Sequence, residues 1–110
     1  MTLSSWRDAE SAVLPVVVTY RVKPGNAAAF EQLLKLHWPT LKDLGLVNER
    51  PAVLLRSQSD PNLYLEVFDW NDKDAAAGAH QLPPVQELWE QMAALCEPSG
   101  GIQPVHYDPV

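Results

Sequence analysis

The order of its element-forming segments is the feature that most constrains this sequence. Four short runs are rich in β-branched and aromatic residues, as strands are, and they are separated by turn-forming or helical segments. These runs span residues 16–22, 52–58, 63–70 and 102–107. Two amphipathic helical segments lie between the first and second runs and between the third and fourth. The predicted order is therefore β-α-β-β-α-β.

The first helical segment begins after Asn26, a good N-terminal cap, and ends before Gly45. His37 lies on its apolar stripe, and Pro39 lies two residues further along. Proline removes a backbone donor and disfavours the helical conformation in the residue before it. We therefore expect a kink or a break near residues 37–38.

The second helical segment opens with acidic residues and reaches His80, where the sequence Leu-Pro-Pro of residues 82–84 interrupts it. An apolar stripe that includes Trp89 then resumes at helical spacing. In the last strand, Pro104 favours an edge position because proline cannot donate to a neighbouring strand.

This order predicts an α+β protein with a ferredoxin-like fold and one antiparallel four-stranded sheet. Two helices cover one face of such a sheet, and a face exposed to water should be polar. Neither side of these strands is polar. We expect the uncovered face to carry Val17, Leu54, Tyr64, Phe68 and Trp70. The simplest cover for it is a second copy of the sheet, so we predict a homodimer packed sheet to sheet.

Three charged residues, Arg21, Arg56 and Glu66, are expected on this same face. If the dimer buries them, they must be paired. A structural ion pair is the favoured interpretation, and a polar clamp for a ligand is the alternative.

Composition narrows the class of protein. The chain of 110 residues fits one domain, expected at residues 15–110 after an extension of residues 1–14. Residues 56–110 hold two basic and nine acidic side chains, which disfavours binding to nucleic acid or to an anionic membrane. The single cysteine, Cys96, excludes a disulfide within the chain and is expected to be an inert core thiol. Neither a signal peptide nor an apolar run of about 20 residues is present, so a cytoplasmic protein is expected.

Two stretches of the sequence resemble the antibiotic biosynthesis monooxygenase family. One is residues 64–80, Tyr-Leu-Glu-Val-Phe-Asp-Trp followed by Asn-Asp-Lys-Asp-Ala-Ala-Ala-Gly-Ala-His; the other is the first strand with its Lys-Pro-Gly turn. The resemblance covers about residues 15–107. It implies a dimeric α+β barrel with a pocket between sheet and helices in each subunit. It also implies oxygenation of small quinol-like aromatics without metal or flavin, since the electron-rich substrate supplies the reducing power.

Some family members degrade haem instead. Their iron-binding histidine stands about where this chain has Trp89, which cannot ligate iron, so the resemblance disfavours haem degradation here. Metal binding is also disfavoured by the wide separation of the three histidines, His37, His80 and His106.

Five residues are candidates for the site. His80 is the predicted catalytic residue, because the family position and the near-neutral titration of imidazole suit a proton acceptor for a phenol hydroxyl. A helix-capping role for His80 is the alternative. The predicted pocket residues are His37, Trp38, Trp70 and Trp89, each of which also suits a purely structural core position.

The predicted function is therefore a cofactor-independent monooxygenase acting on a small aromatic. One alternative is a non-catalytic ligand-binding or stress-related dimer, whose pocket its own tryptophans would fill. A further alternative is an isomerase or lyase, which would need an acid–base pair, such as His80 with a carboxylate within hydrogen-bond reach.

Overall fold

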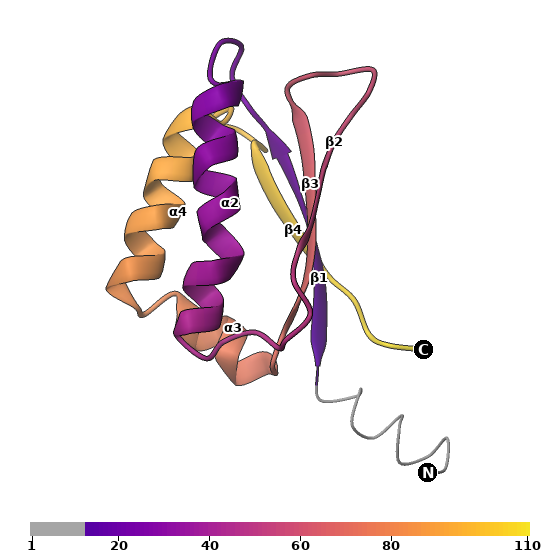
Figure 1. Cartoon of the computed structure of the whole chain (residues 1–110), viewed down its shortest axis with the longest axis vertical. Coiled ribbons are helices and arrows are strands. Elements are labelled where there is room, and N and C mark those ends of the chain that lie inside the picture. Colours follow the sequence, from indigo (N-terminus) through magenta and orange to yellow (C-terminus); the bar gives the residue numbers. More distant parts are fainter. Residues whose placement is uncertain (1–12) are drawn as a thin grey trace.

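The computed structural model describes residues 13–110 and contains four strands and three helices (Figure 1). The predicted N-terminal extension therefore lies almost entirely outside the described residues. The elements in chain order are β1 (Leu14–Arg21), α2 (Ala27–Asp43), β2 (Val53–Arg56), β3 (Leu63–Trp70), α3 (Lys73–Ala79), α4 (Pro83–Leu95) and β4 (Ile102–His106).

The strands form one antiparallel sheet in the order β2-β3-β1-β4, and the helices cover one face of it (Figure 1). This is the predicted ferredoxin-like α+β arrangement. The hairpin of β2 and β3 and the edge position of β4 are confirmed. Of the helices among residues 13–110, none is both long and apolar enough to cross a membrane.

The second helical segment divides as predicted, because α3 ends at Ala79 and α4 starts on Pro83, where proline is well tolerated. Of the predicted kink or break near residues 37–38, the break is wrong, since α2 runs through these residues and Pro39 to Asp43. Pro39 deprives the Lys35 carbonyl of its helical donor. Lys35 is exposed, so water can hydrogen-bond to that carbonyl, and the helix continues without a break.

Gly45 ends α2 as predicted. It has a φ of +73°, in the left-handed region that glycine adopts readily. The backbone N–H of Leu46 donates to Leu41 over 3.0 Å, and that of Gly45 donates to Lys42 over 3.0 Å. These two bonds form a Schellman motif, which turns the chain back toward the sheet.

The register corrects the predicted assignment of side chains to the two faces. Val16 lies opposite Phe68, and Tyr20 lies opposite Tyr64, so these four residues share the face covered by helices. Tyr64, Phe68 and Trp70 were expected on the other face. Alternation within each strand was predicted correctly, but the pairing of faces between β1 and β3 was not, because it depends on the register.

Of the three charged residues, Arg21 lies on the face opposite to Glu66, whereas Arg56 is paired across the strands with Tyr64 and shares the face of Glu66. Glu66 lies on the inner face under the helices and is fully buried, whereas Arg21 lies on the outer face and is paired with Asp60 at 3.9 Å. Arg56 pairs with Glu31 of α2 at 3.4 Å. The favoured interpretation, structural ion pairs, therefore holds for Arg21 and Arg56, although their partners are Asp60 and Glu31 rather than Glu66, which pairs with His37.

The inner face and the helices enclose the hydrophobic core. Val16, Val18 and Tyr20 of β1 are buried against apolar side chains of α2 and α4, and Cys96 is buried as predicted. The helical contributors include Phe30, Leu34, Leu41, Val85, Leu88 and Met92.

The outer face of the sheet is aliphatic and uncovered in the single chain. Val53 and Leu55 of β2 are each 51% exposed, and Val105 of β4 is 49% exposed. Between them, Val17 of β1 and Leu65 of β3 are partly exposed. The physical reason for predicting a sheet-to-sheet homodimer therefore holds with a corrected set of residues, and the dimer itself stays a prediction.

Candidate functional site

A cavity of about 560 Å³ lies between the inner face of the sheet and the helices. Every helix and three of the strands contribute to it. Its walls are mostly apolar and aromatic, and it brings together all three histidines of the chain. The residues that matter for its chemistry are Tyr20, His37, Phe68, Trp70, Lys73, His80, Trp89 and His106.

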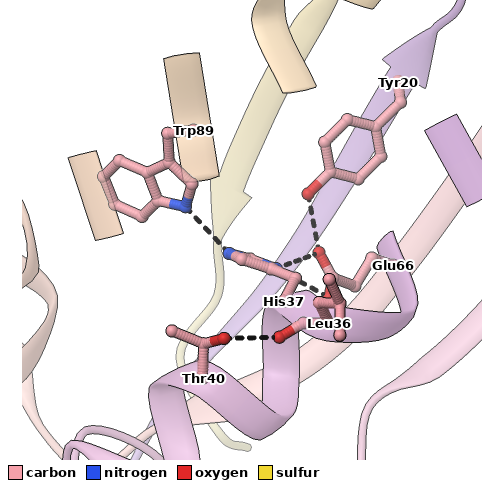
Figure 2. A network of polar contacts seen from close by, with 6 residues as sticks. All are labelled: Tyr20, Leu36, His37, Thr40, Glu66 and Trp89. Atoms are coloured by element: carbon pink, nitrogen blue, oxygen red, sulfur yellow. Dashed lines mark hydrogen bonds and ion pairs between the residues drawn. The ribbon is translucent and has the colours of Figure 1, made fainter. Parts of the chain in front are cut away.

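A buried polar group in this cavity is the imidazole of His37, which projects from α2 toward the sheet and is 3% exposed (Figure 2). Its Nδ1 lies 2.9 Å from both carboxylate oxygens of Glu66, which is fully buried on β3 behind it. The ring edge also packs against Phe68, with centroids 5.7 Å apart. Paired and packed in this way, the imidazole has a fixed orientation.

Tyr20 of β1 completes the surroundings of the carboxylate. Its hydroxyl donates to Oε1 of Glu66 over 2.6 Å (Figure 2). Burial and the neighbouring Glu66 raise the pKa of Tyr20 well above its usual value near 10, so the phenol remains a donor. The buried carboxylate thus accepts hydrogen bonds from two side chains on two different elements, which offsets much of its desolvation.

The second ring nitrogen of His37 identifies the tautomer. Nε1 of Trp89 lies 2.8 Å from Nε2 of His37, and an indole N–H can only donate (Figure 2). Nε2 must therefore accept with its lone pair, and the proton is on Nδ1, facing Glu66. This assignment follows from the hydrogen-bond partners.

A histidine held in this way is prepared to take up a proton. The lone pair of Nε2 lies at the cavity wall, and the carboxylate of Glu66 on the opposite side of the ring stabilises the imidazolium that forms. The N–H of Trp89 occupies the position that a ligand hydroxyl would take. The arrangement can therefore accept a proton from a hydroxyl that displaces Trp89 from Nε2.

His80, the predicted catalytic residue, lies at the cavity but is exposed. It caps the C-terminus of α3, and its ring packs edge-on against Trp89 with centroids 4.9 Å apart. Its backbone carbonyl accepts from Gln86 over 2.6 Å. The structure thus places His80 at the rim and His37 at the floor.

Three of the four predicted pocket residues line the cavity, and one does not. His37, Trp70 and Trp89 line the cavity, and Trp70 also packs edge-on against Phe68 at 5.2 Å, so it is both wall and core. Trp38 is not among the lining residues. It is half-buried against the core, and its Nε1 has no hydrogen-bond partner among the described residues.

Two residues belong to the site but were not predicted as site residues from the sequence, Glu66 and Tyr20. A sequence signal existed for the first, because Glu66 is the one charged residue among the alternate positions 64, 66, 68 and 70, whose other members are aromatic. Both aromatic neighbours are buried, and Glu66 shares their face. Without the register, the partner of that carboxylate could not be named.

The cavity is open and is not filled by the chain's own tryptophans, which was the observation expected to separate a working pocket from a filled one. Within residues 13–110, no group of three or more histidine, cysteine, aspartate or glutamate side chains could hold a metal ion.

Comparison with known proteins shows which solved structures have a similar fold. No protein-family model matches the sequence, and no curated protein matches it. A Bordetella bronchiseptica protein assigned to the antibiotic biosynthesis monooxygenases is 22% identical, with a TM-score of 0.74 over 90% of this chain and 98% of that one. SnoaB from Streptomyces nogalater, a cofactor-independent oxygenase, is 19% identical, with a TM-score of 0.74 over 90% and 94% of the two chains.

A Nitrosomonas europaea protein with the same assignment is 14% identical, with a TM-score of 0.74 over 91% of this chain and 92% of that one. Structural neighbours from this group thus cover most of the chain. At these identities the similarity establishes the fold. The resemblance predicted from the sequence is confirmed at that level.

Proposed function

We propose that the protein is a cofactor-independent monooxygenase that acts on a hydroxylated aromatic compound of the quinol or naphthol type. The observation that carries the proposal is the buried His37–Glu66 pair at the floor of an apolar, aromatic-walled cavity. The cavity volume of about 560 Å³ is in the range of small-molecule sites. The description of SnoaB as a cofactor-independent oxygenase supports the reaction class.

In this reaction the protein must supply a base that removes the hydroxyl proton, rather than a cofactor. Removing the hydroxyl proton gives an oxyanion whose ring is electron-rich enough to reduce O₂. One oxygen atom then forms a new bond to a ring carbon, and the other leaves as water with the two hydrogens that the substrate loses. A naphthol and O₂ thereby yield a naphthoquinone and water.

His37 is the proton acceptor in this proposal. Its Nε2 takes the hydroxyl proton, while Glu66 keeps hold of the Nδ1 proton and stabilises the cation. Trp70 and Phe68 supply aromatic surface for a planar ring. His80, predicted from the sequence as the proton acceptor, lies at the rim, and its catalytic role stays a prediction.

Oxygen uptake tests the function. The purified protein, with a chelator present and no flavin added, is expected to consume O₂ with a panel of naphthols, anthrones and quinols and to form the corresponding carbonyl products. His37→Gln should lower the rate about 100-fold or more, because a positioned general base contributes at least that much. His80→Gln should have a smaller effect.

Glu31→Gln is the matched control, since Glu31 also accepts from a tyrosine hydroxyl over 2.6 Å but lies away from the cavity. It should retain the wild-type rate. Absence of uptake with every substrate class, or a His37→Gln protein as active as the wild type, would remove the basis of the proposal.

We also propose that two chains associate through the outer face of the sheet. The uncovered aliphatic side chains of β2 and β4 support this, because a contiguous apolar patch of this kind usually marks an interface. In sedimentation, the wild type is expected at twice the mass of one chain. Leu65→Glu should give monomers, whereas Leu36→Glu, at a 55% exposed position on α2, should not. A monomeric wild type at micromolar concentration would contradict the proposal.

A further inference from the structure

The charge of the cavity lining is opposite to that of the protein. The chain carries 14 acidic and 8 basic side chains, for a formal charge of −6. The described residues that line the cavity nevertheless include one lysine and three histidines, and none is an aspartate or glutamate. Glu66 lies behind His37 and is already bonded to it and to Tyr20.

The cation and two of the histidines lie at the rim. Lys73, His80 and His106 are exposed, whereas His37 and Tyr20 are buried at the floor. The register explains the grouping. His106 of β4 lies beside Val16, which lies opposite Phe68, and Lys73 follows the end of β3 by three residues. The ends of β3 and β4 and the start of α3 thus meet at one mouth.

Lys73 is available for a ligand at this mouth. Within residues 13–110 it has no ion-pair partner. Asp72, next to it, caps α3 by accepting from the backbone N–H of Ala75 over 2.8 Å, and neither Asp72 nor Asp74 lines the cavity. The nearby imidazoles can each donate an N–H to an anion.

We infer that the cavity takes an anionic hydroxylated aromatic, a hydroxyaryl carboxylate, with its hydroxyl at His37 and its carboxylate among Lys73, His80 and His106. This rests on the proposed function for the orientation of the hydroxyl. The carboxylate would receive charge-assisted hydrogen bonds at the rim, while the apolar ring spans the aromatic walls. A neutral aromatic of the same size would fill the walls but leave the rim cation solvated.

Binding of two matched probes tests the inference without any turnover. Hydroxynaphthoate and the corresponding hydroxynaphthamide have the same shape and differ in charge. We expect the wild type to bind the carboxylate about fivefold or more tightly in calorimetry at low salt, as for a partly exposed ion pair. The preference should shrink as salt is added. Lys73→Met should abolish the preference, and Lys73→Glu should reverse it.

Lys35→Met is the control, because Lys35 is an exposed lysine that does not line this cavity, and it should keep the preference. Equal affinity of the wild type for the two probes, no binding of either, or the same effect from Lys35→Met and Lys73→Met would each overturn the inference. Oxygen uptake is measured separately. A protein that prefers the carboxylate but consumes no O₂ contradicts the proposed reaction and leaves this inference standing.

Discussion

Two tyrosine–glutamate pairs lie on the inner face of the sheet. Their hydrogen bonds have the same length, but the surroundings of the two carboxylates differ. Tyr20 and Tyr64 are direct cross-strand partners, and each donates to a glutamate over 2.6 Å, Tyr20 to Glu66 and Tyr64 to Glu31. The ring of Phe30 packs against both, with centroids 5.0 Å from that of Tyr20 and 5.3 Å from that of Tyr64.

The difference lies in what surrounds each carboxylate. Glu66 is fully buried and also bonds His37 at the cavity, whereas the side chain of Glu31 is 34% exposed and pairs with Arg56, itself largely exposed. A permanent cation and water satisfy Glu31. Glu66 has a histidine as its partner, whose charge changes when it takes up a proton. The same tyrosine–glutamate contact is thus structural in one place and suited to proton transfer in the other.

The largest effect is expected from removing the two carboxylates in turn. Glu66→Ala should destabilise the fold by about 3–5 kcal/mol, because it breaks a buried pair and leaves the donors of His37 and Tyr20 without an acceptor. Glu31→Ala should cost about 1 kcal/mol or less, as surface pairs do. Urea unfolding of both variants measures this. Equal losses of unfolding free energy in the two variants would mean that burial does not distinguish the two pairs.

A smaller difference is expected for the hydroxyls. Tyr20→Phe should cost about 1.5–3 kcal/mol, because it takes a donor from a buried carboxylate, and Tyr64→Phe about 1 kcal/mol. Both variants keep the ring, so packing against Phe30 is retained. Thermal or urea unfolding checks the order. A larger loss for Tyr64→Phe would contradict the account of the two sites.

The smallest expected difference between the two tyrosines is in how far each lowers the free energy of unfolding at alkaline pH. Burial and Glu66 raise the pKa of Tyr20 well above 10; burial and Glu31 also raise that of Tyr64, although Arg56 lowers it. Above about pH 10, the unfolded chain loses the phenol proton while the folded protein keeps it. The unfolded state then binds fewer protons, so stability is full below pH 10 and falls as the pH rises.

Unfolding free energies measured between pH 9 and pH 11 should therefore decline less steeply in Tyr20→Phe than in Tyr64→Phe. Burial raises the pKa of Cys96 to about 11, which adds the same decline to both variants and to the wild type. If the two variants had identical slopes, the burial of Tyr20 would have no effect on its titration.

Much of the fold was predictable because local chemistry determines it. Strand and helix periods, the Pro83-Pro84 interruption and the Gly45 turn are properties of neighbouring residues, and the structure has all of them. The break at Pro39 was not realised, because one lost hydrogen bond on an exposed turn can be replaced by water.

The site was less predictable because it depends on register. Alternation in residues 63–70 shows that Glu66 shares a face with Tyr64, but it does not tell which face of β1 that is. The predicted set therefore included His37 and Trp89 without the carboxylate that joins His37 to the sheet. It also included Trp38, one helical position from His37, which packs against the core and does not line the cavity.

The fate of the two atoms of O₂ tests the central claim most directly. In a reaction under oxygen-18 gas with a hydroxyaryl substrate, we expect one labelled atom in the new carbonyl of the product and the other in water. His37→Gln should form this product at about one hundredth of the wild-type rate or less. Unlabelled product, label from water, or labelled product formed equally fast by His37→Gln would contradict the claim.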